Sequence, residues 1–253
     1  MKTFTRVQAW RTARASLAGK KSTLGFVPTM GALHKGHLSL VERSVKENDY
    51  TLVSLFVNPT QFNNKEDFEK YPNSLEEDLK LLDRAGVDFT LCPPAAEMYA
   101  DDYRYKVTEN QISRILCGAF RPGHFDGVLT VVMKLLGLAQ AQRCYMGEKD
   151  YQQLMLIREM AENFFLPVEI IPCPTVREKS GLAMSSRNTR LSTEGRERAA
   201  LIYKTLRAAD NSVAAQDQLL DLGFKVEYVE EYWGRRFAAA WLENVRLIDN
   251  VQI

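Results

Sequence analysis

Short runs of apolar and β-branched residues recur along the chain. Neighbouring positions within each run are both hydrophobic, which is typical of strands buried on two faces. Segments with the spacing of amphipathic helices lie between most of these runs. Buried strands are therefore predicted at Thr23–Val27, Thr51–Val57, Val87–Leu91, Arg143–Met146 and Val168–Ile171.

The segment Ser74–Ala85 illustrates the helical pattern. Leu75, Leu79 and Leu82 fall on one face, and Ser74 with Glu77 has the spacing of a capping box. Strands that alternate with such helices predict an α/β fold, a Rossmann-like doubly wound parallel sheet with helices on both sides. Further helices are predicted at Leu38–Lys46, Val128–Leu138 and Tyr151–Phe165, with an amphipathic helix near the N-terminus.

The pattern changes after Pro174, where a polar loop replaces the apolar runs. A single helix is predicted from about Thr193 to Leu222, followed by three short strands. We therefore place a domain boundary at this proline: residues 1–174 form the Rossmann-like domain and residues 175–253 a second, smaller α+β lid domain. The three strands are predicted at Phe224–Tyr228, Phe237–Leu242 and Val245–Ile248.

Composition narrows the class of partner. Lys and Arg number 33 against 32 Asp and Glu, so no basic field favours nucleic acid or an anionic membrane. The N-terminus lacks the apolar stretch of a signal peptide, and Val128–Ala141 is shorter than the about 20 residues that span a bilayer. We expect a soluble cytoplasmic protein that acts on small molecules, with no nucleic-acid or membrane partner. Its reduced, mostly buried thiols would be Cys92, Cys117, Cys144 and Cys173.

Two histidines stand where the strand Thr23–Val27 leads into a helix. Gly31 and Gly36 let the backbone turn and let an anion approach the free N–H groups at the helix start. His34 and His37 lie on the same side of that start. Imidazoles beside a nucleotide α-phosphate suit nucleotidyl transfer without an enzyme nucleophile. The alternatives are a helix cap with a surface histidine, or half of a zinc site that lacks further ligands.

A second polar segment, Gly147–Gln153, follows the strand that ends at Met146. Gly147 and Lys149 at a strand end suit the ribose and a phosphate of a nucleotide. Asp150 and Gln153 also have the spacing of a capping box, which would be a purely structural role.

Two other segments add polar groups. Met184–Arg187 brings two hydroxyls and a guanidinium to the domain boundary, which suits a loop that grips phosphates. Gln61 follows the strand Thr51–Val57 and can both donate and accept, as binding of a hydroxy acid requires. The third histidine, His124, lies in a loop with Arg121 and Gly123.

Five motifs lie between Val27 and Asn188, and together they resemble the motifs of one known family. VPTMGALHKGH, FVNPTQF, RPGHFDGV, GEKDYQQL and GLAMSSRN closely resemble the pantothenate synthetase family, the pantoate–β-alanine ligases of the H-x-G-H nucleotidylyltransferase superfamily. The resemblance implies an ATP-dependent ligase that condenses pantoate with β-alanine through a pantoyl-adenylate intermediate. The products would be pantothenate, a coenzyme A precursor, with AMP and pyrophosphate. Gln61 and Gln153 would hold pantoate, with Gln61 also near β-alanine.

The resemblance implies further roles. His37 would be the acid-like donor to the phosphates, with His34, Lys149 and Arg187 completing the catalytic set. Mg²⁺ is expected as a counter-ion of ATP, with no protein ligands assigned, and a homodimer is implied. The ATP-binding residues would be Met30, Gly31, Ala32, Leu33, His34, Lys35, Gly36, His37, Gly147, Glu148, Lys149, Asp150, Val176 through its backbone, Met184, Ser185, Ser186 and Arg187.

The chain departs from the family pattern in places. Cys117 stands where the family commonly has Glu, and Met146 where an aromatic ring is usual. The C-terminal domain is expected to be shorter than the family's usual form. Glu77 and Asp78 are further acids that could meet the metal from outside, although the exposed start of a helix is the stronger expectation for both.

Two other functions compete. Another H-x-G-H nucleotidyltransferase, making a nucleotide-linked coenzyme, would share the two histidines but would not need Gln61, Gln153 and the GEKDYQQL motif. A non-catalytic nucleotide-binding protein would be indicated by loss of the catalytic set named above, and all of that set is present.

Overall fold

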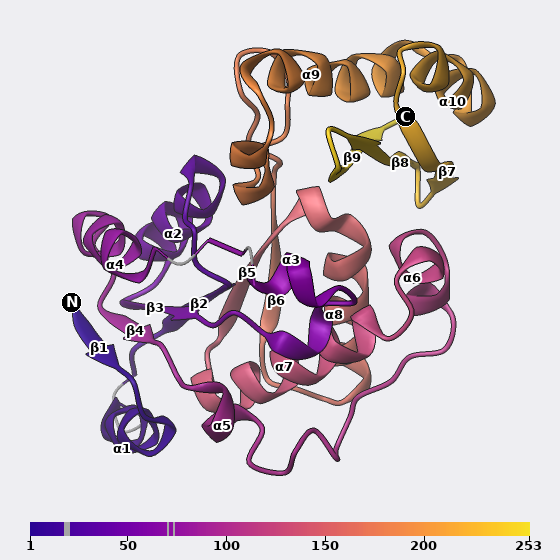
Figure 1. Cartoon of the computed structure of the whole chain (residues 1–253). Coiled ribbons are helices and arrows are strands. Elements are labelled where there is room, and N and C mark those ends of the chain that lie inside the picture. Colours follow the sequence, from indigo (N-terminus) through magenta and orange to yellow (C-terminus); the bar gives the residue numbers. More distant parts are fainter. Residues whose placement is uncertain (18–20, 70, 73) are drawn as a thin grey trace.

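The computed structural model describes residues 1–17, 21–69, 71–72 and 74–253. A parallel sheet flanked by helices forms the larger part of the molecule, and a unit of two helices and three strands lies over one end of it (Figure 1). The α/β fold predicted from the alternation of strands and helices is confirmed.

The larger sheet has six strands in the order β1-β4-β3-β2-β5-β6, all parallel. From β2 the chain adds β3 and β4 in one direction, and β5 and β6 lie in the other. The order therefore reverses between β2 and β5, and ligands of open α/β sheets bind beyond the carboxyl ends at such a point. The bounds are β1 Lys2–Phe4, β2 Leu24–Thr29, β3 Tyr50–Leu55, β4 Phe89–Leu91, β5 Arg143–Gly147 and β6 Glu169–Cys173.

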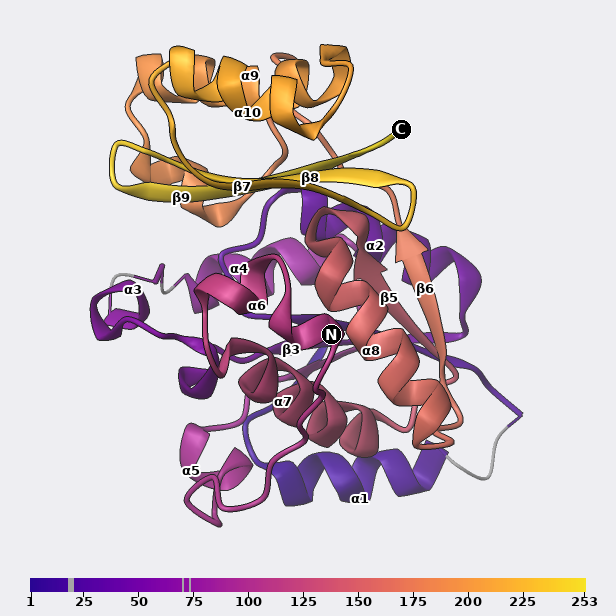
Figure 2. The same ribbon diagram turned by 90° about the vertical axis from the view of Figure 1, so that its right-hand side faces the viewer.

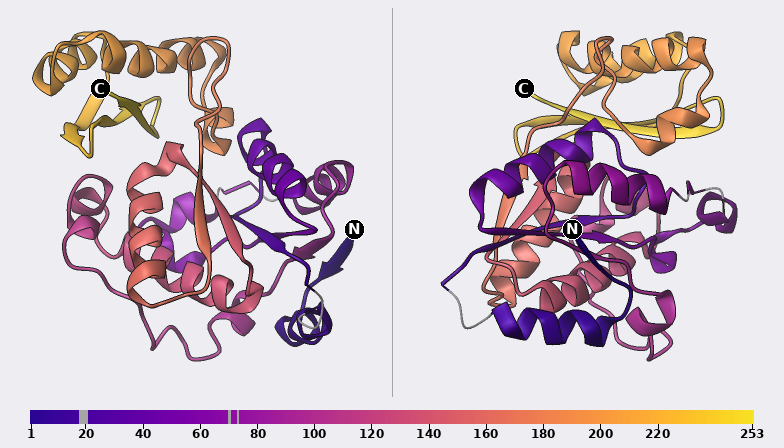
Figure 3. Two further views of the ribbon diagram at one scale, coloured as in Figure 1. Left: turned by 180° about the vertical axis from the view of Figure 1, so that it is seen from behind. Right: turned by 90° about the vertical axis from the view of Figure 1, so that its left-hand side faces the viewer.

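Both faces of this sheet are buried, as its continuous apolar runs predict. Phe26 and Leu52 belong to the core under one layer of helices, whereas their neighbours Val27 and Val53 belong to the core on the opposite face. The right-hand view of Figure 3 shows the two helical layers on either side of the strands. One layer contains α1 (Val7–Leu17), α7 (His124–Ala139) and α8 (Tyr151–Asn163), and the other contains α2 (Lys35–Glu47) and α4 (Leu75–Arg84).

Short helical segments connect these elements. They carry much of the polar chemistry described below, because they lie at strand ends and between the two parts of the molecule. They are η1 (Pro59–Gln61), α3 (Lys65–Glu69), α5 (Ala95–Met98), η2 (Ile112–Arg114), α6 (Cys117–Phe120), η3 (Glu148–Asp150) and η4 (Ser186–Arg190).

The C-terminal unit is a three-stranded antiparallel sheet covered by two helices. Two-residue turns at Trp233–Gly234 and Glu243–Asn244 join its strands, with φ of 51°, 67°, 50° and 61°, the positive values that type I′ turns require. Figure 2 shows the sheet between its own helices and the larger domain. Ala238 accordingly joins the core of the unit, while Phe237 joins the core of the larger domain. The elements are α9 (Thr193–Ala208), α10 (Ser212–Asp221), β7 (Lys225–Tyr232), β8 (Arg235–Leu242) and β9 (Val245–Gln252).

Two details differ from the sequence predictions. The edge strand β1, three residues long, was not predicted because so short a run carries no periodicity. The single helix expected from Thr193 to Leu222 is two helices, because Ala209 is extended (φ −71°, ψ 145°) and the Asn211 side chain accepts from the Ala214 amide to start α10.

Other expectations concern the whole chain. The four cysteines are free, and all but Cys92 are buried. None of the helices in the described ranges is long and apolar enough to cross a membrane. The last strand of the parallel sheet ends at Cys173, although the division of the chain at Pro174 into two domains stays a prediction.

Candidate active site

A cavity of about 240 Å³ opens beyond the carboxyl ends of β2 and β5, where the strand order reverses. We call it the main cavity. Four segments far apart in the sequence converge on it, since the segments after β2, β3 and β5 and the loop before η4 all reach this edge. The predicted site residues that line it are Met30, His34, Gly36, His37, Gln61, Gly147, Lys149, Asp150, Gln153, Val176, Met184, Ser185, Ser186 and Arg187.

The two histidines after β2 bind the helix start and each other. His34 is the residue before α2, and its Nδ1 accepts from the Gly36 amide at 3.1 Å. The His34 amide donates in turn to Nδ1 of His37 at 3.4 Å, so the pair forms a reciprocal capping box of imidazoles. Their rings stack with centroids 4.0 Å apart. The structural alternative of a capping histidine is therefore correct for His34, but His37 is no surface residue.

These hydrogen bonds assign the protons of both rings. An Nδ1 that accepts from a backbone amide carries no proton, so the proton of each neutral ring lies on Nε2. Burial, assisted by His34 and Lys149, lowers the pKa of His37 to about 3. Burial and Lys149 lower the pKa of His34 to about 4. Both histidines are thus neutral N–H donors at neutral pH, rather than cationic acids.

A buried carboxylate holds the backbone that precedes these histidines. Asp78 of α4 is 2% exposed, and its two oxygens accept from the amides of Ala32 and Leu33, each at 2.8 Å. The expectation that Asp78 lies at an exposed helix start is wrong. The Ser74–Glu77 capping box is also wrong, because the Ser74 hydroxyl donates to Asp78 at 3.0 Å and caps no backbone amide.

The segment after β5 contributes a cation and an amide. Lys149 Nζ lies 3.7 Å from a carboxylate oxygen of Asp150. Asp150 makes no side-chain cap, so the capping-box alternative with Gln153 is not formed. Gln153 lines the main cavity, whereas its neighbour Gln152 is buried and bonds to the backbone of Ile112, Ile115 and Cys117. The two glutamines are adjacent in sequence, but the turn of α8 places Gln153 at the cavity and Gln152 in the core.

Gln61 is positioned by a buried asparagine. Asn58 is 1% exposed, and its Nδ2 donates to Gln61 Oε1 at 2.9 Å. The Gln61 carbonyl accepts from Nδ1 of His124 at 2.8 Å and from Arg121 at 3.2 Å. Burial, with Arg121 next, lowers the pKa of His124 to about 3. His124 is therefore a neutral positioning residue between Gln61 and Arg121.

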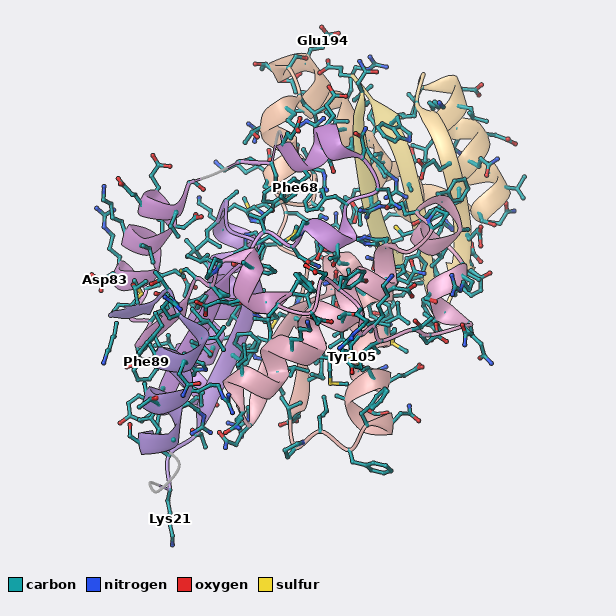
Figure 4. All side chains as sticks on the ribbon, turned by 60° about the horizontal axis from the view of Figure 1, so that its bottom comes forward. Lys21, Phe68, Asp83, Phe89, Tyr105 and Glu194 are labelled. Atoms are coloured by element: carbon teal, nitrogen blue, oxygen red, sulfur yellow. The ribbon has the colours of Figure 1, made fainter. Side chains whose placement is uncertain are left out.

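The loop before η4 forms the opposite wall of the cavity. The Ser185 hydroxyl accepts from the Arg187 amide at 3.3 Å, and the Val176 carbonyl accepts from the Met184 amide at 3.0 Å. Arg187 donates to Asp67 of α3 at 3.0 Å. Figure 4, where Phe68 marks α3, shows this helix beside the C-terminal unit.

Some predicted site residues do not line the main cavity. Gly31, Ala32 and Leu33 shape the loop that Asp78 holds, and Lys35 is exposed. Glu148 approaches Arg235 of the C-terminal sheet at 3.5 Å instead. Residues of the site that the sequence did not predict are Asp67, Tyr71 and Thr175, and Asp78 was expected there only as an outer contributor to a metal site.

The donor set of the cavity suits a polyanion more than a bare metal ion. No group of three or more His, Cys, Asp or Glu residues placed to hold a metal occurs in the described part of the chain. Asp78 already accepts from two amides and a hydroxyl. Thr175 Oγ1 is buried without a hydrogen-bond partner and lines the cavity, as expected of a group that awaits a ligand.

A doubly wound sheet with neutral imidazole donors, a lysine and an arginine around one cavity at its switch point defines a nucleotide-dependent α/β enzyme. The family model of Pantoate-beta-alanine ligase matches residues 2–252. The chain therefore belongs to the pantoate–β-alanine ligase family and is an enzyme of that kind.

The similarity to known relatives, in sequence and in structure, extends along almost the whole chain. The Pantothenate synthetase of Bdellovibrio bacteriovorus is 52% identical over 97% of this chain and 96% of its own length. The pantothenate synthetase structure from Thermus thermophilus has a TM-score of 0.92, with 41% identity over 100% of this chain and 99% of that one. The Francisella tularensis ligase, solved with β-γ ATP and β-alanine, has a TM-score of 0.94, with 42% identity over 100% and 97%.

The departures from the family pattern can be placed in this structure. Cys117 lies in a buried contact with Tyr228 at 3.1 Å, and Met146 lines the main cavity. That the C-terminal domain is shorter than the family's usual form stays a prediction, since these relatives are matched almost from end to end.

Proposed function

We propose that the enzyme joins pantoate to β-alanine in two half-reactions through a pantoyl adenylate. A carboxylate oxygen of pantoate attacks the α-phosphorus of ATP, and pyrophosphate leaves. The neutral amine of β-alanine then attacks the acyl carbon, AMP leaves, and the nitrogen loses one proton to give the amide of pantothenate. The observation that carries this proposal is the convergence of two neutral histidine donors, Lys149 and Arg187 with Gln61 and Gln153 on one cavity.

The first half-reaction places negative charge on the phosphates. His34 and His37 present Nε2–H groups that are fixed by their Nδ1 hydrogen bonds, so they can stabilise the transition state without reorganising. Lys149 and Arg187 add positive charge from two other segments. Gln61 and Gln153 would orient pantoate so that its carboxylate lies in line with the departing pyrophosphate.

An acyl adenylate is hydrolysed by water, so the second half-reaction needs a closed cavity. The C-terminal unit lies over the open end of the sheet (Figure 1), and Arg187, just after the loop that leads into η4, contacts α3. We propose that this loop closes over the phosphates. Closing would exclude water until the amine has reacted.

Mg²⁺ enters this proposal only as a counter-ion of the triphosphate. Asp150 is the carboxylate of the described chain that lines the main cavity, and it would meet the ion through water. The ion would offset phosphate charge during departure of pyrophosphate.

The test is pantoate-dependent exchange of labelled pyrophosphate into ATP, followed by AMP formation in equal amount to pantothenate when β-alanine is added. His37→Ala should slow exchange by roughly 10²-fold to 10³-fold, the typical effect of losing one preorganised donor. The free energy of unfolding should fall by only about 1 kcal/mol, because the His34 amide loses its acceptor. Lys46→Ala, at the exposed far end of α2, is the matched control and should leave exchange unchanged.

Absence of exchange with pantoate would overturn the ligase mechanism. Exchange that required a nucleotide-linked coenzyme precursor instead would favour the other nucleotidyltransferase, and nucleotide binding without turnover would favour a sensor. The homodimer and the cytoplasmic location also remain proposals. Light scattering on the purified protein and fractionation of cells would test them.

A further inference from the structure

Two further spaces adjoin the main cavity. A cleft of about 670 Å³, here the interdomain cleft, lies between α3, α6 and the C-terminal unit. A side pocket of about 40 Å³ lies beneath β8 and β9. Arg121, Lys149 and Asp150 line both spaces and the main cavity. These three side chains therefore mark the junction where all the spaces meet.

Arg121 differs from the other cations at this junction because it has no carboxylate partner. Among the described residues, no acidic oxygen lies within ion-pairing distance of it. Its guanidinium instead bonds to neutral acceptors, His124 Nε2 at 3.0 Å and the Gln61 carbonyl at 3.2 Å. Burial, and then the nearby Arg246, lower the pKa of Arg121 to about 10, so it is still charged at neutral pH.

The neighbouring cations are already paired. Lys149 lies 3.7 Å from Asp150, and Arg187 lies 3.0 Å from Asp67. Arg246 lies 2.7 Å from Glu227. Arg121 is partly buried, and a guanidinium removed from water without a counter-ion is costly. A bound anion would remove that cost.

The chemistry of the proposed reaction supplies such an anion. Pantoate's carboxylate is consumed when the adenylate forms, and in the mechanism proposed above the phosphates would face the histidines, Lys149 and Arg187. The carboxylate of β-alanine takes no part in bond formation and stays charged throughout. Its amine must reach the acyl carbon while the adenylate fills the main cavity, so its carboxylate must lie beyond that cavity.

We propose that the junction of the main cavity and the interdomain cleft is the amino-acid subsite, and that Arg121 binds the carboxylate of β-alanine there. The proposal rests on the ligase function proposed above. Two of the five guanidinium N–H groups bond to His124 and Gln61, which leaves others for a carboxylate. The same two contacts hold the guanidinium next to the pantoate-binding Gln61, and this places the two substrates side by side.

The test separates the two half-reactions. Arg121→Gln should raise the KM for β-alanine roughly 10-fold to 100-fold, as expected for loss of a charged hydrogen bond. Pantoate-dependent pyrophosphate exchange should fall far less, because His124 still bonds to the Gln61 carbonyl in the variant. Propylamine, which has the amine but lacks the carboxylate, should react equally slowly with both proteins. Arg114→Gln, at an exposed arginine of η2, is the matched control. It should leave the KM for β-alanine and the rate of pyrophosphate exchange unchanged.

Other outcomes are distinguishable. Equal loss of exchange and ligation in Arg121→Gln, or an unchanged KM for β-alanine, would overturn the amino-acid subsite. If Arg121→Gln does not fold, Arg121→Lys, which keeps the charge but loses the planar fork, should still show a raised KM with normal exchange, and normal values for both would contradict the proposal. Absence of exchange in the wild-type protein would instead overturn the ligase function itself.

Discussion

Two walls of the main cavity are built in opposite ways. The histidine wall, Met30–His37, is held by Asp78, which is 2% exposed and bonds to backbone amides of the loop itself. The arginine wall, Ser185–Arg187, is held from α3 by Asp67, whose carboxylate bonds to side chains and is 28% exposed. A buried carboxylate satisfied by amides is fixed, whereas a half-exposed ion pair can exchange partners.

The difference assigns separate tasks to the two walls. In the proposed mechanism, the histidine wall would present its Nε2–H groups in one geometry before ATP arrives, because preorganisation would be the source of their effect. The arginine wall would admit ATP and then bind its phosphates, and Arg187 would do so by exchanging Asp67 for a phosphate of similar charge. The cavity would thus combine a rigid side with a side that closes.

The sharpest way to break the histidine wall is Asp78→Asn. The amide keeps the shape of the side chain but turns an N–H toward a backbone N–H, so one buried amide loses its acceptor. We expect the free energy of unfolding to fall by about 2–3 kcal/mol and pyrophosphate exchange to fall with it. Urea unfolding and exchange measured on the same protein would check both.

Asp83→Asn is the matched control for this prediction. Asp83 lies on the same helix, but it is 64% exposed and pairs with the N-terminal amine. It should change neither stability nor exchange measurably. If Asp78→Asn were as mild as Asp83→Asn, the histidine wall would not depend on its buried carboxylate.

A smaller effect should follow from pH. His37 stays neutral in the folded chain down to a pKa of about 3, while its ordinary value is 6.5. Acid therefore protonates the unfolded chain first, and stability that is complete above pH 6.5 is lost as the pH falls from there toward 3. At about pH 5.5, His37 should lower the free energy of unfolding by about 1 kcal/mol relative to its value at neutral pH.

The check is urea unfolding at pH 7.5 and 5.5 for wild type and His37→Asn. The variant lacks this titrating group, so its stability should fall by about 1 kcal/mol less between the two pH values. An equal fall in both proteins would show that His37 is protonated in the folded state. In that case the neutral-donor role would be wrong.

The fold and the histidine wall were largely predictable from sequence, and physical reasons explain where prediction stopped. Continuous apolar runs identify buried parallel strands, and strand ends identify the catalytic edge, so His34, His37 and Lys149 were expected together. Asp78 was misjudged, although it shares a helix face with Leu82, and an acid on an apolar face needs a buried partner. The spacing of Asp78 and Leu82 therefore indicated that Asp78 is buried.

No comparable signal exists for Asp67 and Arg121. Asp67 lies in a polar segment where an acid is unremarkable, and its contact with Arg187 spans 120 residues. Arg121 is distinguished by having no ion-pairing acid among the described residues, which only the packed structure can reveal. Pairings between segments distant in sequence depend on how α3, α6 and the C-terminal unit pack, and local patterns do not encode this packing.

The smallest expected effect concerns the arginine wall. Burial alone would raise the pKa of Asp67, but Arg187 and Arg190 hold it below its ordinary value, so the carboxylate is charged and competes with ATP for Arg187. Asp67→Asn should remove that competition and tighten ATP binding about twofold to fivefold, as expected for a partly exposed ion pair, with the melting temperature almost unchanged. Isothermal titration with a non-hydrolysable ATP analogue would measure the change. Asp83→Asn again serves as the charge-matched control. Weaker binding in Asp67→Asn would mean that Asp67 orients Arg187 toward the phosphates, and both walls would then be preorganised.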